Sequence, residues 1–528
     1  MPEFPMGKHS HSVSFLVFLT VTSLLCGAIV MVIEVLGSRV LGPFFGASLF
    51  VWTSLITVTL VGLALGYVAG GILSDRRESP DYLYGIILAA GILVEFIPFL
   101  RGEVLKLCVP FGLRLGALAS STLLFGPSLF LLGAVSPYII KIAAREMRTI
   151  GKTVGLFYAV STLGSFAGTI CTGFVLIAYF GISQIFTFIG GTLLLLAVVY
   201  FIVFKRHVAV LAFLIIPFIF SGPKPVESKL LPNGTRVERI FSKDSFYGSI
   251  RVLDYSFGDS RTRELIVDGA IQGGIDVKNG LSVYEYYYFL QFIPYLMNPE
   301  GKNCLVIGLG PGVIPMWYEK MGVRTDVVDI DPEIFAVARK YFNFTVSGDS
   351  IVCDARYYLN SSTKKYDYVI LDVFNGDNAP VHILSKEMLE VIHAKLAPNG
   401  VLGINLHGSL KKEPFMTASV IDTLKKVFKI VEIYPTFRPE EDEGVGNLAV
   451  IACNGKPRRA DTARANKFPV HPMAASVYDM INRKFEFPGG TNSMVLTDNY
   501  NPIDVHDLWL KEFIRKKIIA DTDMDVLL

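Results

Sequence analysis

The chain has 528 residues, of which 52% are hydrophobic, and its mean hydropathy is +0.47. This composition excludes a wholly soluble enzyme of that length, because the hydrophobic excess lies in the first 220 residues. A net charge of +2 offers no polyanion-binding surface, so no nucleic-acid partner is expected. The six cysteines are scattered without a C-x-x-C pair, so we predict neither a disulfide framework nor a metal site.

The N-terminal half begins with a polar tail at residues 1–12 and is strongly apolar from there to residue 222. Six of its apolar runs are each near the ~20 residues that a helix needs to cross a bilayer core. The predicted spans are residues 13–33, 49–73, 82–100, 117–142, 153–179 and 182–204. We therefore expect an α-helical, multi-pass membrane domain at residues 13–222, with the lipid bilayer as its partner.

Two series of glycines in this half recur at intervals of four residues. One consists of Gly62, Gly66 and Gly70, and the other of Gly164 and Gly168. Small residues at this spacing let helix backbones approach each other inside a bilayer. They are more often packing faces than functional sites, and we interpret them as such.

The orientation of the membrane domain follows from its basic loops. Lysines and arginines are frequent at residues 76–77, 141–152 and 205–206, which six spans would place on one side with the N-terminus, and this side should be cytoplasmic. A further apolar run at residues 208–220 would cover only ~20 Å as an α-helix, short of a ~30 Å core. We expect a re-entrant or interfacial segment there, which leaves the C-terminal half in the cytoplasm. A true seventh span would instead place that half outside.

Residues 223–300 are predicted to be a linker followed by a small β domain. Proline and glycine are frequent at 221–235, which is typical of a linker. Short apolar runs at 235–241, 248–256 and 263–272 are separated by turn residues and predict antiparallel strands. Residues 281–296 predict a helix that leads into the next domain.

Residues 301–331 combine a buried strand, a glycine-rich turn, a helix and a second strand that ends in acids. The turn contains Gly308, Gly310 and Gly312, and Asp329 follows about 20 residues further on. This order of elements is typical of dinucleotide-binding βαβ units. In them, glycines let a ligand approach the backbone closely and the acid binds ribose hydroxyls. The alternative is a tight turn that binds no ligand.

Strands and helices continue to alternate after this unit. The alternation predicts a doubly wound, Rossmann-like α/β domain at residues 301–528. The expected helices are residues 332–342, 385–396 and 415–427. The expected strands include one ending at Cys353 and residues 366–372, 401–406, 429–434 and 447–453.

Three aspartates lie at or just beyond the carboxyl ends of predicted strands, where ligands of such sheets bind. They are Asp329, Asp354 and Asp372. Three carboxylates facing one crevice suit a cationic, hydroxyl-rich ligand. Asp329 is placed for the ribose, Asp354 for an exocyclic adenine amine, and Asp372 for the reacting centre. The alternative is that each of them only caps a helix or a strand end.

These motifs resemble those of the polyamine aminopropyltransferases, the spermidine synthase family, in a form fused to a membrane domain. The soluble part of the resemblance is carried by SFYGSI, DGAIQ, the glycine turn, VVDID, CDA and YDYVILD. The membrane part is carried by EVLGSRVLGPFFGASLFVW and GYVAGGILSDR.

The resemblance implies a methyltransferase-type Rossmann fold with no permanently bound cofactor and no metal. The co-substrate would be decarboxylated S-adenosylmethionine, a sulfonium nucleoside, and the acceptor a small amine. Gln272, Asp329 and Asp354 would bind the nucleoside above the glycine turn, and Asp372 would be the general base. Soluble relatives associate through their small β unit, so a homo-oligomer stays an open alternative.

The chain departs from the family on the amine side of the pocket. Pro311 stands where soluble members have an aspartate that steadies the aminopropyl group, and Asn375 stands in place of a second acid. A methyltransferase that uses S-adenosylmethionine is therefore one alternative. A transporter or sensor whose soluble domain binds a nucleoside without turnover is another.

Overall fold

The computed structural model describes residues 13–46, 49–146, 150–219, 228–373, 381–440, 442–455, 462–506 and 508–521. It consists of two compact units that divide near residue 225. The predicted fold class is confirmed: apolar helices are followed by a small antiparallel sheet and a Rossmann-like α/β domain.

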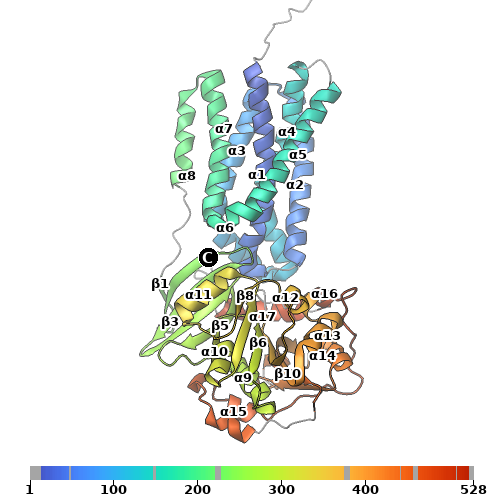
Figure 1. Ribbon diagram of the computed structural model, residues 1–528. Coiled ribbons are helices and arrows are strands. Elements are labelled where there is room, and N and C mark those ends of the chain that lie inside the picture. The colour runs from blue at the N-terminus through green and yellow to red at the C-terminus, as the bar shows by residue number, and fades with distance from the viewer. Residues whose placement is uncertain are drawn as a thin grey trace, which may run out of the picture. The chain divides into compact units, whose positions relative to one another are not determined.

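The first unit is a bundle of long helices (Figure 1). Its long helices are α1 (Val13–Phe45), α2 (Leu49–Arg76), α3 (Pro80–Cys108), α4 (Gly112–Glu146), α5 (Ile150–Cys171) and α7 (Ile182–Lys205). Its short helical segments are η1 (Val109–Phe111), η2 (Thr172–Leu176), α6 (Ile177–Tyr179), η3 (Val208–Ile215) and α8 (Ile216–Ile219). Five helical stretches among the described residues are long and apolar enough to cross a membrane, and one of them runs from α3 through α4.

Large apolar side chains cover the outside of these helices. On α2, Leu60, Leu65 and Val68 are each more than half exposed. An apolar outer surface of this extent would be unfavourable in water, whereas it is the normal surface of a helix bundle in lipid.

The glycines of both series make close helix contacts. A Cβ on Gly66 would lie 2.3 Å from the carbonyl oxygen of Phe130 on α4, and a Cβ on Gly70 2.4 Å from that of Ala134. On α5, a Cβ on Gly164 would lie 2.0 Å from the carbonyl oxygen of Leu24 on α1. These glycines are packing faces, because any side chain would separate the backbones that they bring together.

The apolar run after α7 forms η3 and α8 and packs against α7. A Cβ on Gly191 of α7 would lie 3.7 Å from Cγ of Pro217, so the run folds back along that helix. From the rise per residue of 3₁₀- and α-helices, η3 and α8 together span about 22 Å. This length is below the ~30 Å thickness of a bilayer core. Residue 220 lies outside the described residues, and the side on which the second unit lies stays a prediction.

We predict that Gly66→Ala destabilises the bundle, whereas Gly71→Ala does not. The methyl group at position 66 would enter the α2–α4 contact, and overpacking of this kind costs about 1–3 kcal/mol. A Cβ on Gly71 would meet no atom within 4 Å, so there only the higher helix propensity of alanine acts. Thermal unfolding in detergent micelles should show a lower midpoint for the first variant alone. Equal midpoints for both variants would contradict the packing role.

The second unit begins with a five-stranded antiparallel sheet in the order β1-β2-β3-β4-β5. Its strands are β1 (Ser228–Leu230), β2 (Arg236–Asp244), β3 (Ser249–Phe257), β4 (Ser260–Val267) and β5 (Ala270–Asp276). The expected single strand at 263–272 was wrong, because Asp268 and Gly269 form a turn in which both have positive φ, 48° and 76°. An Asp-Gly pair between apolar runs is a strong hairpin signal, and β4 and β5 pair on either side of it.

The larger sheet has seven strands in the order β11-β12-β10-β9-β6-β7-β8. Its strands are β6 (Asn303–Ile307), β7 (Arg324–Asp329), β8 (Ser350–Val352), β9 (Tyr366–Leu371), β10 (Leu396–Ser409), β11 (Ile430–Pro435) and β12 (Val445–Cys453). Strands β6 to β10 are parallel, whereas β12 is antiparallel to both of its neighbours. The doubly wound sheet is therefore mixed, because β12 follows β11 after a loop too short for a parallel crossover.

Helices cover both faces of this sheet, and alternate strand residues point into two hydrophobic clusters. One face packs against α9 (Glu285–Met297), α10 (Val313–Lys320) and α11 (Pro332–Phe342), and the other against α12 (Ala355–Ser361), α13 (Lys386–Lys395) and α14 (Phe415–Val427). Proline at position 315 is compatible with α10 because it lies in the first turn, where its missing N–H has no intrahelical partner. The carboxyl ends of β6, β7 and β9 are thereby left open at one edge.

Candidate active site

The glycine turn after β6 brings two strand ends into contact. Gly308 has a φ of +88°, and a Cβ there would lie 2.0 Å from the carbonyl oxygen of Asp372 at the end of β9. The N–H of Asp372 donates to the carbonyl oxygen of Ile307, which ties the two ends together. Only glycine fits this position, and the contact places Asp372 directly beside the turn.

Asp329 holds the other side of the turn. Its Oδ2 accepts from the N–H of Leu309 at 2.8 Å, and its Oδ1 accepts from the N–H of Asp331 at 2.9 Å. The carboxylate is therefore fixed at the end of β7 with lone pairs still available for ligand hydroxyls. Asp354 caps α12 by accepting from the N–H of Tyr357 at 2.9 Å, and its other oxygen lies 3.6 Å from Nε2 of His382. Asp354 therefore caps a helix, which was the alternative interpretation of this residue. It also lines the pocket.

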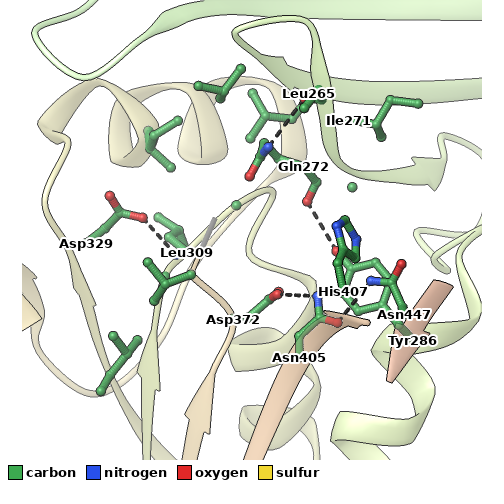
Figure 2. Close-up of a pocket in the computed structure, with 18 of the residues that line it drawn as sticks. Leu265, Ile271, Gln272, Tyr286, Leu309, Asp329, Asp372, Asn405, His407 and Asn447 are labelled. Carbon is green, nitrogen blue, oxygen red and sulfur yellow. Dashed lines mark hydrogen bonds between the residues drawn. The ribbon is translucent and has the colours of Figure 1, made fainter. Parts of the chain in front are cut away.

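Asp372 is oriented by a chain of amides. Asn405 Nδ2 donates to Asp372 Oδ1 at 2.8 Å, and Asn447 Nδ2 donates to the Asn405 side-chain oxygen at 2.9 Å (Figure 2). Among the described residues no hydrogen bond engages Asp372 Oδ2. One oxygen is therefore held in place, while no described residue holds the other by a hydrogen bond.

Gln272 enters the pocket from β5 and is fixed by α9. The hydroxyl groups of Tyr286 and Tyr287 donate to the Gln272 carbonyl oxygen at 3.3 and 2.8 Å. Figure 2 shows the Gln272 side chain on the opposite side of the site from Asp372. The small sheet and the Rossmann-like domain thus line the same site.

These residues line one cavity of about 570 Å³, a normal size for a small-molecule site. Six of the seven predicted site residues lie in its wall: Gln272, Gly308, Gly310, Asp329, Asp354 and Asp372. The seventh, Gly312, is not part of the wall. Its φ is +82°, and a Cβ there would lie 2.6 Å from Phe344, so it serves the close packing of α10. Asn375 lies outside the described residues.

Burial changes the acidity of two of the carboxylates. It raises the pKa of Asp372 to about 6, and the hydrogen bond from Asn405 opposes this change. Burial also raises the pKa of Asp329 to about 6, against the hydrogen bonds from the N–H groups of Asp331 and Leu309. A carboxylate with a pKa near 6 is mostly ionised at pH 7 and is a stronger base than an ordinary aspartate.

Several wall residues were missed from the sequence. They are Tyr284, Tyr286, His382, Asn405, His407 and Asn447, and the face of a C-terminal helix, α17 (Leu508–Asp521). A signal existed for Asn405, which is a polar residue near the carboxyl end of an apolar strand. The others depend on contacts between segments that are distant in the sequence.

A fold of this kind, with acids at adjacent strand ends and a glycine turn below them, is that of a Rossmann-like domain, in which ligands bind beyond the carboxyl ends of the strands. Residues 285–458 match the family model of the spermine/spermidine synthase domain. The C-terminal region of this chain is therefore a spermidine synthase-like domain.

The relatives that the chain resembles include a methyltransferase and several aminopropyltransferases. The chain is 28% identical over 306 residues to an N-terminal histidine N-methyltransferase of Emericella nidulans, covering 51% of this chain and 54% of that one. It is 31% identical over 177 residues to a polyamine aminopropyltransferase of Vibrio vulnificus, covering 32% and 56%. A similar enzyme of Alkaliphilus metalliredigens is 28% identical over 258 residues, covering 46% and 82%. The chain thus spans about half the length of the first two relatives.

Among solved structures, a probable spermidine synthase from Corynebacterium glutamicum aligns with a TM-score of 0.38 at 18% identity. The alignment covers 43% of this chain and 85% of that one.

We predict that Asp372→Asn stabilises the protein at neutral pH. Because the folded-state pKa lies above the ordinary value of 3.8, the unfolded chain ionises first, and stability is lost as the pH rises from about 4 to about 6. Two pKa units correspond to about 3 kcal/mol, so we expect a gain of about 1–3 kcal/mol at pH 7.5. Thermal unfolding at pH 4 and at pH 7.5 measures it, with exposed Asp259→Asn as the control. A gain that is equal at both pH values would contradict the assignment.

Proposed function

We propose that the second unit is a transferase that moves an alkyl group from a sulfonium nucleoside to an amine nitrogen, with Asp372 as the general base. The observation that carries this proposal is the position of Asp372, which lines the cavity beside the glycine turn with one of its oxygens held by Asn405. Membership in the spermidine synthase-like family favours the aminopropyl group of decarboxylated S-adenosylmethionine as the group transferred. Acceptors would be a polyamine or another amine.

The chemistry requires a neutral amine. Its nitrogen lone pair attacks the methylene carbon bonded to the sulfonium sulfur, and the carbon–sulfur bond breaks with its electron pair going to sulfur, which leaves as a neutral thioether. An alkylammonium with a pKa near 10.4 needs about 4–5 kcal/mol to lose its proton at pH 7. Asp372 would accept that proton and hold the nitrogen in line with the carbon–sulfur bond.

The nucleoside would occupy the opposite side of the cavity. Asp329 would bind the ribose hydroxyls and Asp354 the adenine amine, while the turn at Gly308 and Gly310 lets the ligand approach the backbone. Gln272, which is fixed through its backbone by two tyrosines, would hold the sulfur end of the ligand. The sulfonium is already a good leaving group, so the proposed reaction needs neither a metal nor a resident cofactor.

Methyl transfer from S-adenosylmethionine is the second candidate. Two observations favour it: Pro311 stands in the glycine turn where the aminopropyltransferases have an acid, and one relative is a histidine N-methyltransferase. Both reactions use the same base and the same nucleoside pocket and differ in the carbon that is attacked.

The test is product analysis by mass spectrometry with both donors and a panel of amines. We expect transfer from one donor in the wild type and a loss of at least about a hundredfold in Asp372→Asn, because general-base catalysis contributes about 10²–10⁴-fold. The wild-type rate should fall as the pH drops below about 6, where Asp372 becomes protonated. Nucleoside binding should survive the substitution. Full activity of the variant would refute the role of Asp372, and tight binding without turnover would favour a sensor.

We further propose that the protein is a multi-pass cell-membrane protein with its catalytic unit in the cytoplasm, where nucleoside donors are made. The basic loops support this orientation, and the short length of η3 and α8 agrees with a segment that does not cross the bilayer. A C-terminal reporter that works only in the cytoplasm should be active when fused to the full chain. Activity of a reporter that works only outside would show that residues 208–220 form a seventh span.

A further inference from the structure

Glu95 is a fully buried acid in the middle of a helix of the first unit. Helix α3 runs from Pro80 to Cys108, so Glu95 lies near its midpoint, about 20 Å from either end at the rise of an α-helix. Its exposed fraction is 0%. Because a glutamate side chain reaches only a few ångströms, this carboxyl cannot extend to water at an end of the helix.

A glycine of α7 makes the space that the carboxyl occupies. Helices α3 and α7 lie side by side (Figure 1), and the ring of Tyr84 stacks on that of Tyr200 with the ring centres 4.1 Å apart. A Cβ on Gly190 would lie 2.6 Å from Oε1 of Glu95 and 2.9 Å from its Cδ and Cγ. The acid is therefore inserted into the contact between the two helices, and only glycine at position 190 leaves room for it.

No described side chain compensates a negative charge on Glu95. Neither of its carboxyl oxygens has a hydrogen-bond partner within the described bundle, and the nearby N–H of Gly191 lies inside α7, where N–H groups bond to the preceding turn. The titratable side chains described on α3 and on the helices packed against it form neither hydrogen bonds nor ion pairs with this carboxyl. On the neighbouring helices these are Cys26, Glu34 and Arg39 of α1, Arg114, Tyr138 and Lys141 of α4, and Tyr200 and Lys205 of α7.

A second acid of α3 shows how a carboxylate is compensated in this bundle. Asp81, in the first turn, accepts from the hydroxyl group of Tyr200 at 2.6 Å, and Nζ of Lys205 lies 3.0 Å from the same oxygen. Its side chain is also 41% exposed. Glu95 lacks the cation, the hydroxyl donor and the exposure. An ionised carboxyl without any of these is costly in an apolar interior, and such groups become neutral instead.

A proton is the cation that fits this position. A metal ion would need several oxygen ligands, and the described residues contain no group of three or more His, Cys, Asp and Glu side chains that could supply them. An organic cation would need space between the helices, and the direct contact of the carboxyl with Gly190 leaves none there. A proton needs only a carboxyl oxygen, removes the charge and supplies a hydrogen-bond donor.

We propose that Glu95 is a proton-binding site of the membrane domain and that the contact between α3 and α7 closes over its protonated form. Release of the proton requires the two helices to part. The O–H bond of the carboxyl then breaks, its electron pair stays on the oxygen, and the proton passes to a water molecule that enters the contact. This inference rests on the proposed membrane location and goes beyond the proposed transfer reaction, because it gives the first unit a proton-linked activity of its own.

Infrared spectroscopy of the full chain in lipid vesicles tests the protonation. The difference spectrum between the wild type and Glu95→Gln at neutral pH should contain the C=O stretch of a protonated carboxyl, and transfer of the wild type to heavy water should shift this band. The control is Glu103→Gln, because the Glu103 side chain is 83% exposed and lies 3.5 Å from Lys106, so that only carboxylate bands should change. A carboxylate band from Glu95 would overturn the proposal, as would a carboxyl band that heavy water leaves unshifted after prolonged incubation.

Chemical labelling needs only the wild type and therefore does not depend on the folding of a variant. Dicyclohexylcarbodiimide dissolves in lipid and adds to protonated carboxyl groups, whereas a water-soluble carbodiimide with an added amine modifies exposed acids. Mapping of peptides by mass spectrometry should find the first adduct on Glu95, in an amount that falls as the pH rises, and the second on Glu103. Absence of any adduct on Glu95 after prolonged reaction would contradict the proposal, since a site that exchanges its proton must open.

Extraction of membranes with alkaline carbonate separates failure of this inference from failure of the proposed location. A chain that stays in the membrane but carries an ionised Glu95 would remove the proton site and keep the location. A chain that is released into solution would overturn the location and the inference together. Retention in the membrane, with a protonated and exchangeable Glu95, is the result that we expect.

Discussion

The site depends on the close contact between the ends of β6 and β9. Because Gly308 has no side chain, the carbonyl of Asp372 can lie where a Cβ would otherwise be, at 2.0 Å. The glycine turn at the floor of the pocket and the Asp372 carboxylate beside it are therefore parts of one junction. Asp329 extends the junction to β7 by accepting from the N–H of Leu309. A substitution in this turn would disturb the geometry of all three strand ends together.

The same junction explains why its carboxylates are unusual. Asp372 and Asp329 are held in a poorly hydrated crevice, and burial raises the pKa of each to about 6. The cost to folding is only partly offset by backbone and amide donors, which also fix the direction in which each carboxylate points. A cationic ligand would recover part of that cost on binding. The pocket would thus be electrostatically prepared for the proposed sulfonium before any ligand arrives.

The local features of the site could be predicted from the sequence, because each is encoded within a few residues. Strand, glycine turn, helix and terminal acid all lie between residues 301 and 331, and the strand ends of Asp354 and Asp372 follow from the same alternation. The hairpin at Asp268 and Gly269 is also encoded locally. Its Asp-Gly pair is a hairpin signal, but it lies within the run of ten residues that we expected to form a single strand.

Other features were not predictable, because they arise only when distant segments meet. Asn447 reaches Asn405 across two antiparallel strands, and that pairing depends on the reversed direction of β12. The position of α17 in the pocket wall depends on a hydrogen bond from Arg515 to a carbonyl oxygen about 250 residues earlier in the chain. Neither contact leaves a periodic or short-range pattern. The side of the pocket that the strand ends form is therefore encoded locally, whereas the side that α17 lines is built from long-range contacts. Since the family match ends at residue 458, the likeness to that family includes the strand-end acids but not the side of the pocket that α17 lines.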